Sequence, residues 1–148
     1  KVVTAFTLAH TITLALAVMQ VVNLPPRLIE SGIAATIVYV AAENFWVKST
    51  GHRWMLTFFF GLVHGFGFAN RLLELGLPTF GLTRSLLSFN LGVEVGQIVI
   101  VGVLWPVIWW IERRAHEKKV KFGVSFVIFL LGVGWFLERA FTLSFMPF

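Results

Sequence analysis

Three ionisable side chains interrupt long apolar stretches of the chain, and they are the residues best suited to chemistry. His64 lies in a glycine-punctuated run over 60–70, while His10 and Glu94 lie in two other apolar stretches. Imidazole and carboxylate groups together suit divalent zinc, nickel, cobalt, iron or manganese. The sequence holds no H-x-x-x-H pair, so a metal site would need ligands from separate segments. We therefore take His10, His64 and Glu94 as candidate metal ligands.

Composition places the segments that carry these residues in a membrane. The 148 residues are 57% hydrophobic and 13% charged, whereas soluble domains carry about 25% charged residues. The apolar runs are long and continuous, which predicts an all-α polytopic transmembrane helix bundle in contact with the lipid bilayer. The absence of cysteine excludes disulfides, thiolate metal sites and cysteine nucleophiles. We attribute the net charge of +5 to basic residues that set the membrane topology and contact anionic lipid, and we expect no nucleic-acid partner.

Five segments are long enough to cross a bilayer, which needs about 20 apolar residues. We predict spans at 2–22, 27–47, 53–75, 85–111 and 121–141, within a single transmembrane helical domain over 1–148. The sequence opens at Lys1 without methionine. We therefore expect a fragment or processed chain whose preceding helix is missing.

Lysine and arginine placement predicts the orientation, because cytoplasmic loops carry an excess of both residues. An amino terminus inside puts eight basic residues on the cytoplasmic side and four on the other. We predict an integral protein of a bacterial inner membrane, with its N-terminus cytoplasmic and its C-terminus extracytoplasmic.

The three candidate ligands share one depth. At about 1.5 Å of rise per residue, His10 lies about 12 Å and His64 about 16 Å from the inner face. Glu94, entered from the outside, lies about 16 Å from the inner face of a ~30 Å core. A charge at this depth costs at least about 2.5–3.5 kcal/mol. Three ionisable groups at one depth lower this cost if they bind each other or share one ion. We therefore expect the side chains of His10, His64 and Glu94 to converge.

Polar residues one or two turns away would support the site. Asn90, Glu94 and Gln97 are spaced i, i+4, i+7 and form one stripe, with Gly92 and Gly96 as a small-xxx-small pair beside it. Further second-shell or pathway groups are Thr7 and Thr13, which share a helix face with His10, and Glu43 and Asn44, which suit an inner vestibule. A structural hydrogen bond across helices explains each histidine alone equally well.

The motifs together resemble the HupE/UreJ-type membrane proteins. The family patterns F-T-x-A-H-S-x-T-L, G-L-x-H-G-x-G-F-A and F-N-x-G-V-E-x-G-Q match the segments at 6–14, 61–69 and 89–97, with Thr11 in place of the serine. The family's preceding G-x-D-H-L-L-F-type helix has no counterpart here. The resemblance implies that an upstream aspartate and histidine complete the site, and that nickel or cobalt is the ion.

Three functions are compatible with these residues. The leading one is a divalent transition-metal permease (nickel, cobalt or zinc) with His10, His64 and Glu94 as ligands and Glu43 as a cytoplasmic relay. Because five helices are few for alternating access, a missing helix or a homo-oligomer would have to contribute. The alternatives are an intramembrane metal-dependent hydrolase, in which Glu43 or Glu94 activates water, and a non-catalytic membrane accessory subunit. We lean away from an enzyme, because no H-E-x-x-H motif and no clear nucleophile is present.

Overall fold

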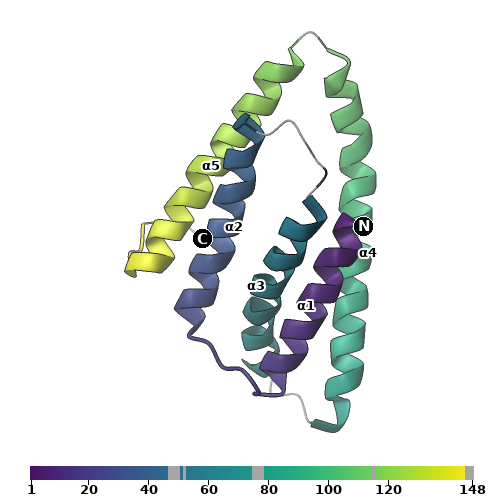
Figure 1. The fold of residues 1–148 in the computed structure, drawn as a ribbon, viewed down its shortest axis with the longest axis vertical. Helices are drawn as coiled ribbons and strands as arrows, with labels where there is room; N and C mark the ends of the chain where they lie inside the picture. Colours follow the sequence, from purple (N-terminus) through teal and green to yellow (C-terminus); the bar gives the residue numbers. More distant parts are fainter. Residues whose placement is uncertain (47–50, 52, 75–78, 115, 146–148) are drawn as a thin grey trace.

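The described residues form five helices and no strand, which confirms the all-α prediction (Figure 1). The computed structural model describes residues 1–46, 51, 53–74, 79–114 and 116–145, with side chains for all of these except 70, 71, 73, 74 and 79–83. The helices are α1 (Val2–Val18), α2 (Pro26–Trp46), α3 (Arg53–Glu74), α4 (Thr79–Glu112) and α5 (Glu117–Phe141).

Three stretches of the described chain are long and apolar enough to cross a membrane. They are α2, the part of α4 over Arg84–Glu112, and α5. Helix α1 is also apolar but has 17 residues, fewer than the others. The chain is thus an integral membrane protein by the character of its helices, and its exposed apolar side chains suit contact with lipid.

The first helix ends earlier than predicted. It stops at Val18, not at Val22, because Gln20 adopts a left-handed backbone with φ of 57°. The amides of Val21 and Gln20 then bond back to Leu16 and Ala17, which caps the last turn of the helix. An apolar run that continues through this cap gives no sequence signal for the stop.

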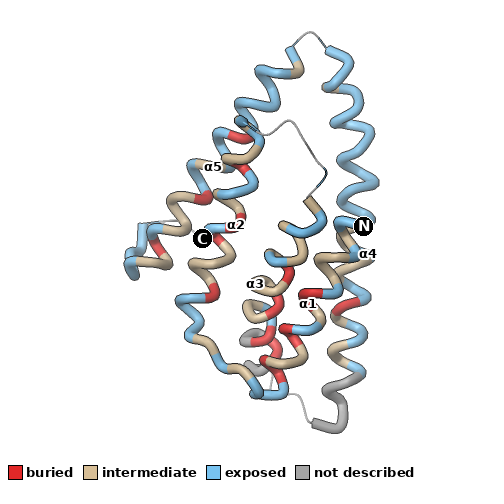
Figure 2. The backbone as a smooth tube through the Cα atoms, viewed as in Figure 1, coloured by how far each residue is buried: buried red, intermediate tan, exposed pale blue. Residues whose placement is uncertain are grey.

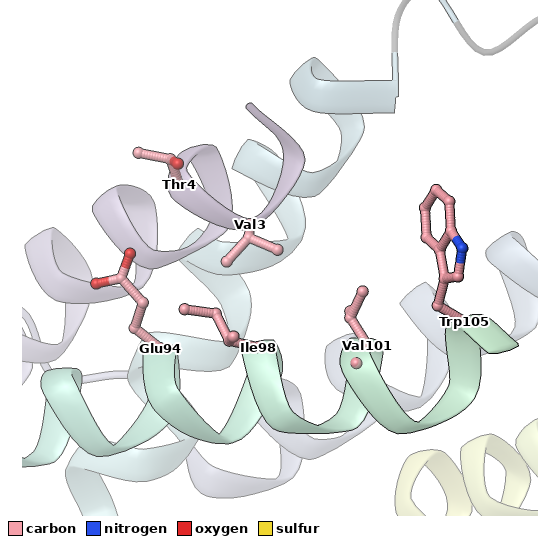
Figure 3. A pocket seen from close by; sticks show the side chains of 7 residues that line it. Val3, Thr4, Glu94, Ile98, Val101 and Trp105 are labelled. Carbon is pink, nitrogen blue, oxygen red and sulfur yellow. The ribbon is translucent and has the colours of Figure 1, made fainter.

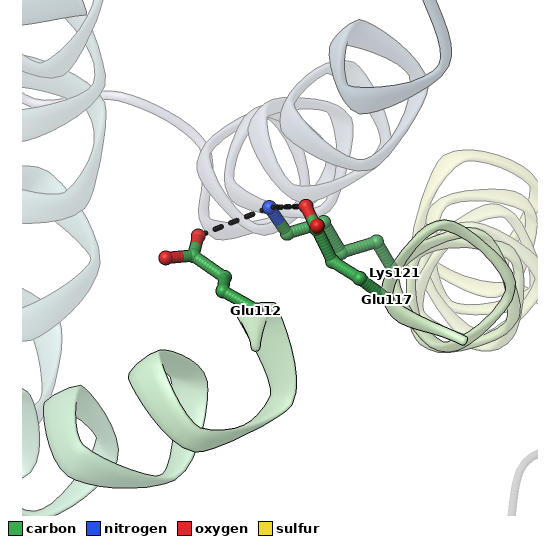
Figure 4. A network of polar contacts seen from close by, with 3 residues as sticks. All are labelled: Glu112, Glu117 and Lys121. Carbon is green, nitrogen blue, oxygen red and sulfur yellow. Dashed lines mark hydrogen bonds and ion pairs between the residues drawn. The ribbon is translucent and has the colours of Figure 1, made fainter. Parts of the chain in front are cut away.

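Helices α4 and α5 both begin earlier than predicted. Helix α4 starts at Thr79 instead of Ser85, since a glycine such as Gly81 is tolerated in membrane helices. Helix α5 starts at Glu117 instead of Lys121, and a 3.0 Å and a 2.8 Å ion pair join the Lys121 ammonium to Glu112 and Glu117. Figure 4 shows the Lys121 ammonium between the carboxylates of Glu112, at the end of α4, and Glu117, at the start of α5. Helix α2 begins at Pro26, one residue before the predicted Arg27, and α3 begins at Arg53 as predicted, while their predicted ends Val47 and Leu75 lie outside the described residues.

Two helix pairs build the bundle. Helix α1 packs most extensively on α3, and α2 packs on α5. Helix α2 also contacts α3, α1 contacts α4, and α4 meets α5 little. Figure 2 shows buried residues along α1 and α3, whereas the half of α4 nearer its C-terminus is exposed. The apolar core lies between α1 and α3, where Leu14, Val18 and Ala69 are buried.

The backbones of α1 and α3 meet at two glycines. A Cβ at Gly65 would strike the Thr13 hydroxyl and the His10 carbonyl oxygen, and Gly61 faces the Phe6 carbonyl in the same way. This is the close approach expected from a small-residue seam. At the small-xxx-small pair Gly92 and Gly96 on α4, a Cβ would meet no described atom within 4 Å, so the described residues form no second seam there. Helix α4 turns its polar stripe toward α1, which leaves the two glycines on other faces.

Candidate functional site

His10 is the most enclosed polar residue of the site. It is 0% exposed, and its Nδ1 lies 3.1 Å from Oδ1 of Asn90 on α4. Nδ2 of Asn90 donates to the Leu86 carbonyl oxygen at 2.9 Å. The donation to Leu86 directs Oδ1 of Asn90 toward His10. A hydrogen bond across 80 residues thus joins α1 to α4 at the level of the histidine.

Three phenyl rings surround the His10 imidazole. Phe6 and Phe89 lie on it nearly parallel, at centroid distances of 5.9 and 6.0 Å and interplanar angles of 20° and 16°. Phe68 meets it edge-on at 5.5 Å. Stacked and edge-on contacts of this kind are the favoured geometries for aromatic rings. They fix the plane of the imidazole.

The second ring nitrogen of His10 is buried without a partner. Nε2 has no hydrogen bond to any residue that the structure describes. A buried polar atom left unsatisfied costs about 1–3 kcal/mol, so such an atom in a membrane helix calls for a functional explanation. A neutral imidazole nitrogen is a common metal ligand. Nε2 of His10 therefore fits a transition-metal ion.

His64, on the α3 side of the α1–α3 seam, also has a ring nitrogen that can donate an electron pair to a metal ion. Its Nδ1 lies 2.8 Å from the Phe60 carbonyl oxygen, one turn back on α3. The Phe6 ring stands 5.4 Å from the His64 ring and also contacts His10, so one phenyl side chain touches both imidazoles. Because a carbonyl oxygen can only accept, Nδ1 of His64 carries the proton, which leaves Nε2 as the electron-pair donor of the neutral ring.

Glu94 lines an open groove between α1 and α4, with a volume of about 630 Å³. Figure 3 shows its carboxylate directed toward α1, near Thr4. On either side of Glu94 along α4, Asn90 bonds His10 and Gln97 accepts a 3.4 Å hydrogen bond from Thr7. The polar stripe of α4 thus faces α1. The remaining lining residues are apolar or small: Val3, Ile98, Val101, Gly102 and Trp105.

The described residues contain no group of three histidine, cysteine or acidic side chains placed to hold one metal ion. His10 and His64 share the α1–α3 seam and the Phe6 ring, whereas Glu94 stands about one helical turn, some 6 Å of rise, from the Asn90 level. A single centre formed by all three residues stays a prediction.

One protein-family model matches most of the chain. The family model described as HupE / UreJ protein matches residues 1–139. The chain belongs to this family. No curated protein and no solved structure matches this chain. Membership in the HupE / UreJ family, which is linked to nickel and cobalt uptake, supports a metal-transporter kind of role.

Three residues of this HupE / UreJ protein that we predicted to support the site, Thr13, Glu43 and Asn44, make no hydrogen bond to the imidazole rings of His10 or His64 in the part of the chain that the structure describes. The Thr13 hydroxyl donates to the carbonyl oxygens of Ala9 and His10 in its own helix. Asn44 donates to the Ser125 hydroxyl at 3.2 Å and joins α2 to α5. Glu43 is half-buried on α2, beside Asn44.

The aromatic enclosure was missed from the sequence. Phe6 and Phe68 lie one turn from His10 and His64 respectively, and Phe89 immediately precedes Asn90. An aromatic residue at i−4 or i+4 from each histidine was the available signal. With 16 phenylalanines in the chain, that spacing alone does not distinguish an enclosure from lipid-facing surface.

Proposed function

We propose that this protein carries a divalent transition-metal ion of the nickel or cobalt type across the membrane. The observation that carries the proposal is the buried, unpartnered Nε2 of His10, with His64 beside it on the α1–α3 seam. Two neutral imidazole nitrogens suit nickel, cobalt or zinc better than magnesium or calcium, which prefer oxygen. Family membership supports the same class of ion.

In this proposal His10 and His64 donate Nε2 to the ion, and the seam at Gly61 and Gly65 holds the two helices that carry them at a fixed separation. Glu94 supplies the negative charge that a divalent cation needs in a low-dielectric core. Its groove opens beside α1, so the carboxylate can meet an ion before or after the histidines do.

Polar groups around the ligands complete the path. Asn90, Gln97 and Thr7 bridge α1 and α4 at the levels above and below Glu94. Glu43, half-buried toward the predicted cytoplasmic end of α2, acts as the relay to that side. A second copy of the chain or a further helix would complete the enclosure of the open groove.

Metal binding and uptake test the proposal. Untagged protein, purified without chelator, is dialysed against Ni²⁺, Co²⁺ or Zn²⁺, and its bound metal is measured by mass spectrometry. The same protein in liposomes is assayed for uptake of each ion. We expect His10→Gln and His64→Ala to lose most binding and uptake, while His116→Ala, an exposed histidine before α5, keeps both.

The variant His10→Gln keeps an amide that can bond Asn90, which limits damage to folding. Melting temperature and circular dichroism identify any variant that is simply unfolded. Wild-type metal content and uptake in folded His10→Gln and His64→Ala would overturn the proposal. Wild-type protein that neither binds nor transports any of the three ions would overturn it as well.

A further inference from the structure

The aromatic contacts around His10 leave two orientations of its ring open. The Phe6 and Phe89 rings lie within 20° of parallel to the imidazole, at centroid distances of 5.9 and 6.0 Å. These contacts restrict the plane of the ring, yet they fit equally well when the ring turns by about 180° around its Cβ–Cγ bond. That turn exchanges Nδ1 with Cδ2 and Nε2 with Cε1. The phenyl rings alone therefore do not determine where the nitrogen atoms of His10 point.

Asn90 removes this ambiguity. Its Oδ1 lies 3.1 Å from Nδ1 of His10, and a turned ring would place a carbon atom there instead. The amide of Asn90 cannot turn in compensation, because its Nδ2 already donates to the Leu86 carbonyl at 2.9 Å. An exchanged amide would set two acceptor oxygens against each other. The orientation of the His10 ring is thus determined by a side chain of α4.

The same contact determines which nitrogen carries the proton. Oδ1 of Asn90 can only accept, so Nδ1 of His10 must donate, and Nε2 keeps its lone pair in the neutral ring. His64 reaches the same state through the backbone carbonyl of Phe60, within its own helix. The His10 arrangement differs because its acceptor belongs to another helix and is a side chain that mutation can remove.

We propose that Asn90 is a positioning residue that holds His10 as the Nδ1–H tautomer with Nε2 aimed as an electron-pair donor toward a divalent transition-metal ion. The inference deepens the proposed function and rests on it for the identity of the ion. It also makes donor-competent His10 depend on the contact between α1 and α4. Binding of the ion is then coupled to the position of the helix that carries Glu94.

Ring-¹⁵N-labelled histidine allows a direct test by NMR in lipid nanodiscs without metal. The His10 signals are assigned by their loss in His10→Gln. Asn90→Leu keeps the approximate shape of the residue and removes the acceptor, whereas Asn90→Asp keeps an oxygen facing Nδ1. Ser88→Leu, at an exposed position on the same helix, is the matched control. Zn²⁺, which is diamagnetic, is then titrated into each sample.

We expect His10 in the wild type and in Ser88→Leu to be protonated at Nδ1 and unprotonated at Nε2. In Asn90→Leu we expect a mixture of tautomers and a Zn²⁺ affinity about 10–100-fold weaker, the usual effect of losing a partner that orients a metal-ligating histidine. In Asn90→Asp an oxygen again faces Nδ1, so Nδ1 should again be protonated, although the donation to the Leu86 carbonyl is lost unless the acid is itself protonated.

An Nε2–H tautomer in the wild type would overturn the inference, and this result does not require that any variant folds. A His10 spectrum unchanged by Asn90→Leu would overturn it too. If the wild type binds neither Zn²⁺, Ni²⁺ nor Co²⁺, the proposed function and the donor role of Nε2 both fail, while the tautomer measurement still decides what Asn90 does to the ring. If metal binding persists at wild-type strength in Asn90→Leu, the positioning role alone fails.

Discussion

Gly61 of α3 meets Phe6 of α1 at backbone distance: a Cβ on Gly61 would lie 2.5 Å from the Phe6 carbonyl oxygen. Phe6 also carries the ring that touches both His10 and His64. The glycine therefore does two things at once. It lets the helices approach, and it sets the distance between the backbones that carry the two imidazoles.

A methyl group at this seam should be costly. We expect Gly61→Ala to lower the free energy of unfolding by about 1–3 kcal/mol, the usual penalty of overpacking, because backbone atoms cannot move aside as a flexible side chain can. Thermal melting in detergent measures the change. Gly92→Ala is the control and should melt like the wild type, since no described atom lies within 4 Å of a Cβ there. Equal melting of the two variants would contradict the seam.

Glu94→Gln should separate a functional carboxylate from a structural one. The variant keeps the shape of the side chain, and Glu94 lies in an open groove, so we expect the melting temperature to change little. Metal uptake should fall strongly, because a neutral amide is a poorer ligand for a divalent cation than a carboxylate. Glu112→Gln, at the exposed end of α4, is the control and should keep uptake. Full uptake by folded Glu94→Gln would remove Glu94 from the path.

Arg27 fastens the start of α2 to the end of α5. Its guanidinium donates to the carbonyl oxygens of Arg139, at 3.2 Å, and Ala140, and Glu30 pairs with Arg139 at 3.1 Å. We expect Arg27→Leu to destabilise the fold by about 1 kcal/mol, since it leaves C-terminal carbonyls of α5 without a donor. Glu30→Gln should cost less, because a partly exposed ion pair contributes about 0–1 kcal/mol. Thermal melts that rank the two variants in the opposite order would show that the ion pair is the stronger link.

The predicted orientation can be tested in intact cells. We expect a cysteine at Lys118, in the first turns of α5, to be shielded from an impermeant thiol reagent and a cysteine at Ser144, beyond the end of α5, to react. The chain has no cysteine of its own, so no background labelling arises. Permeabilised cells should label at both positions. The reverse labelling pattern in intact cells would contradict the predicted topology and indicate the opposite one.

Residue spacing along the helices predicted part of the candidate site. Asn90, Glu94 and Gln97 follow i, i+4, i+7, and in the structure all three turn toward α1. The spacing of Gly61 and Gly65 likewise indicated a close helix contact, which exists. Both features depend on the 3.6-residue period of a helix, which is a local property of the chain. The same spacing at Gly92 and Gly96 does not mark such a contact among the described residues, because a Cβ at either glycine would meet no described atom within 4 Å.

The sequence by itself determined that the chain folds as apolar helices that suit a membrane, and it predicted which residues lie deep within them. Insertion of a helix depends on the apolar character of one continuous stretch, because backbone groups in lipid must be satisfied within that stretch. Depth follows from counting residues along the helix axis. Neither property requires knowledge of distant parts of the chain.

Tertiary structure decided which polar groups meet. His10 bonds Asn90, 80 positions away, Phe6 reaches both imidazoles, and Asn44 donates to Ser125 on α5. Residue spacing gives the depth of a side chain but not the rotation of its helix relative to the others. That rotation is set by packing between segments far apart in sequence, such as the glycine contacts of α1 with α3.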